Sequence, residues 1–189
     1  AKYGYGVELS SYDEIVAATC DSGNGFHATH VTNIATGSDP KTKNSGIAPD
    51  AEIVFVSFGT NSSDVANAIQ YIFEYADEVD KPCVINMSLG SHMGPHDGTS
   101  SLDKLIDELT GPGRIIVGAV GNEGESKMHV HKKFTDSDNT VKTMLAYSSD
   151  KAKEATALEI WGDTGSNLKV KVGIADPLKG RIVAQSEFF

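Results

Sequence analysis

Long apolar runs are the first feature that this sequence lacks. Its longest uninterrupted apolar stretch extends only from Ile115 to Val120, whereas a membrane-spanning helix needs about 20 consecutive apolar residues. A membrane span is therefore excluded, and we expect no membrane partner.

Cysteine is also scarce, with Cys20 and Cys83 alone. Two thiols are too few for a disulfide framework, and their spacing predicts no metal site. A single bridge between them stays open.

Basic residues are in the minority. The 189 residues include 16 Lys and Arg against 26 Asp and Glu, which gives a net charge of −10. A protein that binds the phosphate backbone of nucleic acid needs a basic face, so nucleic acid is excluded as a main partner. An enzyme that acts on peptides is not excluded. Apolar residues make up 39% of the chain and charged residues 22%, which indicates a folded protein rather than a disordered one.

Residues 11–120 predict helices and strands in alternation. Ser11–Glu14 fits a capping box, in which the first and fourth residues satisfy free backbone N–H groups at a helix start. The predicted elements, in chain order, are a short helix after Ser11, a helix over Thr29–Thr36, a buried strand over Ala51–Ser57, a helix over Asp64–Glu78 capped by Ser63 or Asp64, a strand over Cys83–Ser88, a helix over Ser101–Leu109 capped within Thr99–Ser101, and a strand over Arg114–Val120.

The order of these elements predicts an α/β fold. Apolar strands without polar alternation are typical of a parallel sheet flanked by helices on both faces. Ligands of such sheets bind at the carboxyl ends of the strands. Two of these ends are Asn86–Gly90 and Gly121–Gly124. Both are therefore candidate site loops by position alone.

The pattern changes after residue 127. Short, partly alternating segments over residues 141–147, 155–161, 168–174 and 180–184 are separated by turn residues, which is typical of antiparallel strands and favours a β-sandwich. We therefore expect a boundary near residue 125. One domain would cover residues 1–125, and a β-rich domain would cover residues 126–189.

Two side chains are candidates for chemistry. His27 is predicted at a loop-to-helix junction beside small residues, where an imidazole combines the exposure and fixed orientation that a general base needs. Alternatively, His27 or His30 caps the helix or packs against it. Asn122 follows an apolar strand and is flanked by Gly121 and Gly124, so its amide could donate to an oxyanion above the sheet edge. Its alternative role is that of an ordinary turn residue in left-handed backbone.

Four segments in this order resemble the subtilisin-like serine proteases, or subtilases. The histidine motif of that family, His-Gly-Thr-His-Val-x-Gly, stands here as His-Ala-Thr-His-Val-Thr-Asn over His27–Asn33. Gly46–Ala51 is similar to its Gly-Val-Ala-Pro-x-Ala segment, Val84–Gly90 to its substrate-binding strand, and Gly121–Gly124 to its oxyanion segment.

The resemblance implies a role for each matching residue. His27 would be the general base of a Ser-His-Asp triad, Asn122 the oxyanion donor, and His30 structural. Ser88, Leu89 and Gly90 would line the cleft for a peptide or protein substrate, which pairs alongside as an added strand. No cofactor and no metal are implied. The resemblance also implies a bacterial, secreted protein, located outside the cell or in the cell envelope.

The family pattern is incomplete in this sequence. Ala28 and Asn33 replace glycines, which favours the alternative of a catalytically dead pseudoprotease that acts as a binding or regulatory module. Asp21 begins an Asp-Ser-Gly motif only six residues before His27, too close for the family's aspartate unless the site is compactly rearranged. Gly98-Thr99-Ser100 precedes Asn122 and lacks the rest of the serine motif. We therefore expect a fragment, inactive alone, whose parent chain supplies the serine beyond Phe189 and the aspartate before Ala1.

The β-rich region offers weaker signals. Glu159–Gly162 resembles a strand of the jelly-roll insertion of certain bacterial subtilases, including some associated with spore germination, which would clamp the catalytic domain or restrict access to its cleft. His129 and His131 alternate as on a strand, and a solvated face is favoured over a metal site. A carbohydrate or protein adhesion module has support only from Trp161 and the tyrosines. Contacts with the missing parts of the parent chain are also expected.

Overall fold

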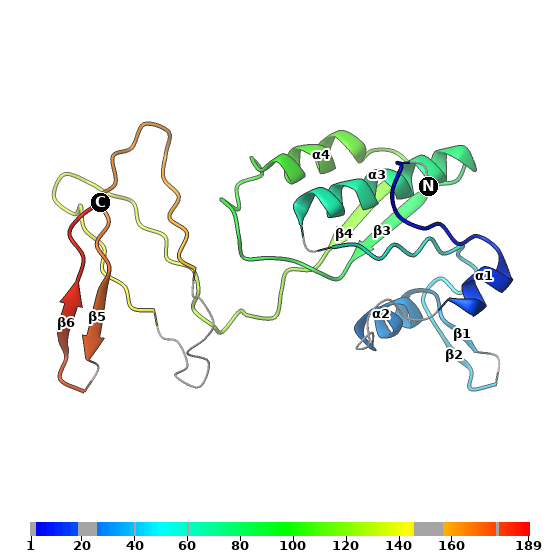
Figure 1. The fold of residues 1–189 in the computed structure, drawn as a ribbon, viewed down its shortest axis with the longest axis horizontal. Helices are drawn as coiled ribbons and strands as arrows, with labels where there is room; N and C mark the ends of the chain where they lie inside the picture. Colours follow the sequence, from blue (N-terminus) through cyan, green and yellow to red (C-terminus); the bar gives the residue numbers. More distant parts are fainter. Residues whose placement is uncertain (1–2, 19–25, 40, 60, 146–156, 177) are drawn as a thin grey trace. The chain divides into compact units, whose positions relative to one another are not determined.

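The computed structural model describes residues 3–18, 26–39, 41–59, 61–145, 157–176 and 178–189. The chain divides into two compact units, coloured along the sequence in Figure 1. The first unit comprises Ala1–Ser91 with Thr99–Ser126, and the second comprises His92–Gly98 with Lys127–Phe189. The second unit thus includes a short segment, residues 92–98, that interrupts the first unit in the sequence. No helix in the described ranges is long and apolar enough to cross a membrane.

The first unit contains all the helices of the described chain and a two-stranded parallel sheet. The β1–β2 pair is antiparallel, and the β3–β4 pair is parallel. The elements are α1 (Tyr12–Ala17), α2 (Phe26–Thr36), β1 (Ser38–Asp39), β2 (Asn44–Ser45), α3 (Ser62–Glu78), β3 (Cys83–Met87), α4 (Ser101–Leu109) and β4 (Arg114–Gly118). The predicted parallel sheet with flanking helices is thereby confirmed at the level of the α/β class.

Capping boxes determine where two of the helices begin. At α4, the Ser100 hydroxyl accepts from the Asp103 N–H at 3.1 Å, while the Asp103 carboxylate accepts from the Ser100 N–H at 3.3 Å. The reciprocal pair at Ser11 and Glu14 begins α1, so both predicted starts are confirmed. The predicted cap of α3 is wrong, because α3 begins at Ser62, two residues before the predicted Asp64, and its cap, Asn61, makes no side-chain capping bond.

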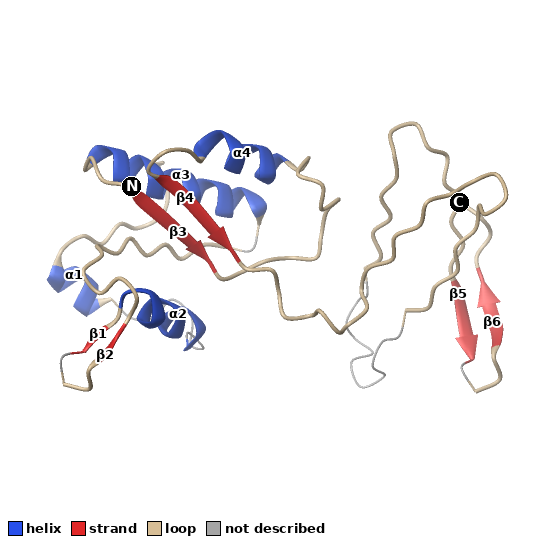
Figure 2. Cartoon of the chain, turned by 180° about the vertical axis from the view of Figure 1, so that it is seen from behind, coloured by secondary structure: helices blue, strands red, loops and turns tan. Residues whose placement is uncertain are grey.

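The core lies between α3 and one face of the β3–β4 pair. Ile69 and Phe73 of α3 are each 2% exposed, and Ile85 of β3 is 6% exposed. The opposite face bears apolar side chains that are at least half exposed, namely Val84, Ile115 and Val117. Figure 2 shows both α3 and α4 beside this pair of strands. The expectation of a sheet covered on both faces is therefore wrong for the described chain, in which α3 and α4 pack on the Ile85 face. Partly buried residues around this core are Val65, Ile72, Cys83, Met87, Leu102, Ile106, Leu109 and Ile116.

The apolar segment predicted as a buried strand over Ala51–Ser57 is not a strand. Its residues form no ladder with another described segment, and Ile53 and Phe55 are 56% and 63% exposed. A strand is stabilised only when a neighbour satisfies its backbone N–H and C=O groups. The prediction was wrong because an apolar run reports a preference for burial and not the presence of a pairing partner.

The second unit contains one antiparallel pair, β5 (Gly173–Asp176) and β6 (Arg181–Gln185), with an irregularity between Ile174 and Ala175. Backbone bonds extend this pairing at the open end: Val170 and Phe189 exchange N–H···O bonds of 2.9 and 3.1 Å. The described parts of the predicted segments 141–147 and 155–161 are not strands. Antiparallel pairing is thus observed, whereas a sandwich of two sheets stays a prediction.

Replacing Phe73 with alanine is expected to lower the free energy of unfolding by about 3–5 kcal/mol, because a large ring is removed from a packed core. Urea denaturation followed by circular dichroism measures this loss. The matched control is Phe55→Ala, for which a loss below about 0.5 kcal/mol is expected because the ring is 63% exposed. Equal losses in the two variants would contradict the assigned core.

Candidate active site

The carboxyl ends of β3 and β4 meet at one edge of the sheet. The register pairs Met87 with Gly118 as the last residues of the ladder. The pairing continues beyond it, because the Ala119 N–H donates to the Met87 carbonyl at 3.1 Å. A Cβ built on Gly90 would lie 4.0 Å from the Ala119 carbonyl oxygen. The loop after β3 therefore lies beside the loop after β4.

The predicted substrate-binding residues Ser88, Leu89 and Gly90 all lie at this edge. Ser88 is half-buried, and its hydroxyl accepts from the Asn86 side-chain amide at 3.1 Å. Leu89 is 39% exposed, and Gly90 is exposed. The apolar Leu89 side chain and the Gly90 backbone are thus accessible to an extended ligand. Asn86 is a residue whose role the sequence did not reveal: it orients the Ser88 hydroxyl.

Asn122 lies in the loop that follows β4. Gly121 before it has a φ of 88°, which a side chain would strain, so the glycine makes the turn. Asn122 does not have a positive φ itself, since the described non-glycine residues that do are Lys43, Asp80, His96 and Lys127. The alternative of left-handed backbone at Asn122 is therefore wrong.

Asn122 is exposed, and its backbone N–H donates to the Glu123 carboxylate at 2.8 Å. No hydrogen bond joins its carboxamide to another residue in the described ranges. Its side-chain N–H groups are therefore not used by another described residue, as an oxyanion donor requires. The contact with Glu123 is local and holds only the backbone.

His27 is the second residue of α2, which begins three residues before the predicted start at Thr29. His27 and His30 are both exposed, and Ala28 is half-buried. In the part of the chain that the structure describes, no hydrogen bond joins the His27 ring to another residue. An imidazole in this setting can accept or release a proton, but no described partner fixes its orientation. Residues 19–25, including the Asp21 motif, lie outside the described residues.

The Gly46–Ala51 motif packs its backbone against the end of α2. The Ile47 N–H donates to the Ile34 carbonyl at 3.1 Å, and the Ala48 N–H to the Ala35 carbonyl at 2.8 Å. A Cβ at Gly46 would lie 2.6 Å from the backbone nitrogens of Thr36, the last residue of α2, and of Gly37, a distance that no side chain can occupy. The motif therefore positions the helix that carries His27.

The ends of β3 and β4 meet at one sheet edge, with Ser88–Gly90 in the loop after β3 and Asn122 in the loop after β4. That Asn122 lies close to Ser88–Gly90 stays a prediction. No described hydrogen bond joins His27 to that edge. That His27 and Asn122 face a shared groove therefore stays a prediction. The residue types that the edge offers, amide donors and one hydroxyl, are suited to binding a peptide and an oxyanion.

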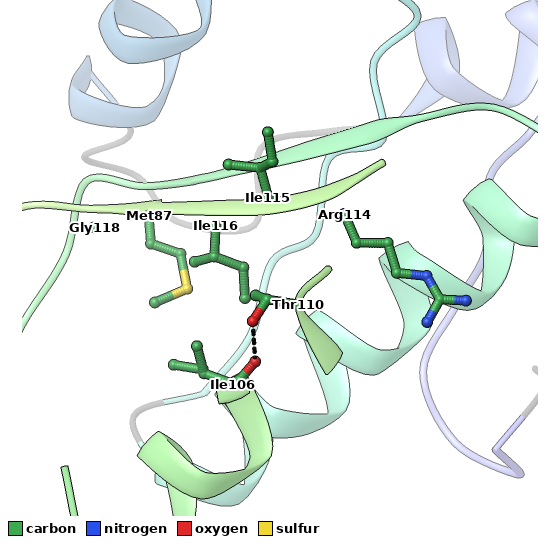
Figure 3. A pocket seen from close by; sticks show the side chains of 7 residues that line it. All are labelled: Met87, Ile106, Thr110, Arg114, Ile115, Ile116 and Gly118. Atoms are coloured by element: carbon green, nitrogen blue, oxygen red, sulfur yellow. Dashed lines mark hydrogen bonds between the residues drawn. The ribbon is translucent and has the colours of Figure 1, made fainter. Parts of the chain in front are cut away.

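The described chain has three other features with chemical groups: a pocket, a free thiol and two exposed histidines. An apolar pocket beside β4, drawn in Figure 3, contains a single charged side chain, Arg114. Arg114 is ion-paired with Asp77, which raises the pKa of the guanidinium. Cys83 is a free thiol whose pKa is raised by burial, which disfavours the reactive thiolate. His129 and His131 are exposed, and among the described residues no group of three or more potential ligands is placed to hold a metal. The pocket is lined by Met87, Ile106, Thr110, Arg114, Ile115, Ile116 and Gly118.

The similarities to known proteins agree with this geometry. Thermitase of Thermoactinomyces vulgaris is 35% identical over 115 residues, covering 58% of this chain and 38% of thermitase. The major intracellular serine protease of Bacillus subtilis (strain 168) is 33% identical over 105 residues, covering 52% of this chain and 30% of that protease. Tripeptidyl-peptidase 2 of Drosophila melanogaster is 27% identical over 137 residues, covering 68% of this chain and 9% of that protein. The chain spans less than two fifths of the length of each of these relatives.

A solved structure shows the same likeness. The structure of the Clostridium perfringens CspB protease matches with a TM-score of 0.52 and 32% sequence identity, over 55% of this chain and 24% of that one. The model of the subtilase family matches residues 8–177, which includes every motif named above. This chain therefore belongs to the subtilase family.

Proposed function

We propose that this sequence is part of a serine endopeptidase that hydrolyses peptide bonds, with the serine and the aspartate of the triad outside residues 1–189. In this proposal His27 is the general base and Asn122 the oxyanion donor. Ser88, Leu89 and Gly90 bind the extended substrate. The observation that carries the proposal is the parallel register of Met87 with Gly118, because the loops that contain residues 88–90 and Asn122 follow these two paired strand ends.

The proposed mechanism gives each of these groups a defined step. The serine hydroxyl attacks the scissile carbonyl while the His27 imidazole accepts its proton. The carbonyl oxygen becomes an oxyanion, which the Asn122 side-chain N–H stabilises. His27 then returns the proton to the leaving amine, and water releases the acyl group by the same steps. The substrate stays in register because its backbone pairs with the 88–90 segment.

A fluorophosphonate probe, which labels an activated serine, tests this proposal. In the complete natural protein we expect one labelled serine, located by peptide mass spectrometry outside residues 1–189. Residues 1–189 expressed alone are expected to remain unlabelled. A labelled serine within residues 1–189 would contradict the assignment. Ser88 and Ser100 are not expected to react, because their hydroxyls have structural partners, Asn86 and Asp103.

A pseudoprotease is the second candidate, and the half-buried Ala28 beside His27 is the observation that favours it. The methyl group stands where the family has a glycine, in the first turn of the helix that presents the base. If the complete protein binds peptides but takes up no probe, this second function replaces the first.

The second unit is proposed to be a β-rich insertion that forms a sandwich of the jelly-roll kind. Its antiparallel β5–β6 pair supports this assignment. In the proposal the domains are residues 1–125 and 126–189. We further propose that the protein is bacterial and acts outside the cell or in the cell envelope.

A further inference from the structure

One side chain of the second unit holds the loop that follows the substrate-binding segment. The Glu159 Oε2 oxygen accepts the Gly94 backbone N–H at 2.7 Å, across 65 residues of sequence. The same oxygen accepts the Trp161 indole Nε1–H at 3.2 Å. These two bonds, and then the charge of His96, lower the pKa of the Glu159 carboxyl. The carboxylate is therefore ionised at neutral pH, and hydrogen bonds to a charged acceptor are stronger than neutral ones.

The held loop, residues 92–98, has a constrained shape of its own. Gly94 has a φ of 104° and His96 a φ of 55°, so the backbone turns sharply at both. The His96 ring nitrogen Nε2 lies 3.0 Å from the His92 carbonyl oxygen, which closes the turn. The backbone of this loop is thus held by two contacts, His96 to His92 and Gly94 to Glu159.

The loop connects two parts of the first unit. It begins two residues after Gly90, the last residue of the proposed substrate-binding segment, and it ends two residues before the α4 cap, Ser100. The α4 end is held by its capping box. Residues 92–98 are therefore joined to Ser88–Gly90 through a single residue, Ser91.

We propose that Glu159 is a positioning residue for peptide binding, which rests on the function proposed above. By fixing the Gly94 amide, it orders the 92–98 loop and with it the end of the Ser88–Gly90 segment. Because Glu159 itself does not touch the reacting atoms, the proposal predicts an effect on KM and not on kcat. It also assigns a function to the Glu159–Gly162 motif, whose residues make no catalytic contact.

The first test is amide hydrogen exchange in the complete natural protein, resolved at residues 92–98. Glu159→Ala is expected to accelerate exchange at Gly94 by about 5–10-fold, because a hydrogen bond to a charged group is lost. Glu159→Gln keeps an acceptor and is expected to show a smaller increase. The matched control is Glu187→Gln, an exposed carboxylate of the same unit with no side-chain partner among the described residues. It should leave exchange at Gly94 unchanged. Exchange at Gly94 that is equal in Glu159→Ala and wild type would overturn the proposal.

The second test separates positioning from a merely structural role. With an extended peptide substrate, Glu159→Ala is expected to raise KM by about 3–10-fold at unchanged kcat, with partial recovery in Glu159→Gln. Faster exchange at Gly94 with an unchanged KM would overturn the coupling to substrate binding. If the wild-type protein cleaves no peptide, the proposed function fails, while the exchange experiment and the affinity for the same peptide, measured by calorimetry, still decide the role of Glu159.

Discussion

Replacement of His27 by alanine in the complete natural protein is expected to lower kcat for a peptide substrate on the order of 10⁶-fold. That magnitude is the loss of kcat found when the catalytic histidine of subtilisin is removed. The physical reason is that a serine hydroxyl is a weak nucleophile until a base removes its proton. KM is expected to change little, because the imidazole contacts the reacting atoms rather than the extended peptide.

The His27 experiment needs a control for folding and one for histidine replacement in general. His27 is exposed on the first turn of α2, so the variant should keep the circular dichroism spectrum and melting temperature of the wild type. His129→Ala removes an equally exposed imidazole from the second unit and should keep full activity. More than a tenth of wild-type kcat in the His27 variant would eliminate this residue as the base.

The second large effect is expected at Asn122. Asn122→Ala should lower kcat by about 10²–10³-fold, a magnitude again taken from another member of this family. The carboxamide has no hydrogen-bond partner among the described residues, so its loss leaves no protein group unpaired and should not destabilise the fold. KM should stay within about twofold, because the oxyanion forms only in the transition state.

Two further variants define this effect. Asn122→Asp preserves size but replaces the N–H donor with a negative charge, so it should reduce kcat at least as strongly as alanine does. Asn44→Ala removes an exposed carboxamide in β2 and should leave both constants unchanged. A loss confined to KM would show that Asn122 binds the substrate in its ground state and would refute the oxyanion role.

The two predictions differ in their structural support. Asn122 and Ser88–Gly90 lie in the loops that follow two paired strands, which supports the proposal that Asn122 is close to a bound peptide. His27 belongs to a separate part of the first unit, packed by residues Gly46–Ala48. An experiment at His27 therefore tests an assignment carried by sequence motif, and one at Asn122 tests an assignment carried by both motif and geometry.

The sequence by itself determined the features that depend on neighbours within one or two turns of the chain. The capping boxes at Ser11 and Ser100 were readable because donor and acceptor lie three residues apart. Local helix signals predicted α3 and α4, and the motifs indicated the family. Helix signals of this kind survive in isolation because every hydrogen bond closes within the same segment.

Only the tertiary structure decided which strands find partners and which faces are covered. Ala51–Ser57 has the same apolar character as β3, yet it forms no ladder, because pairing depends on a distant segment. The register of Met87 with Gly118 and the bond from Gly94 to Glu159 join residues whose sequence separation carries no local signal. Such contacts form only when folding has offset the entropy of closing the intervening chain, so the sheet edge and the held loop emerge from the fold as a whole.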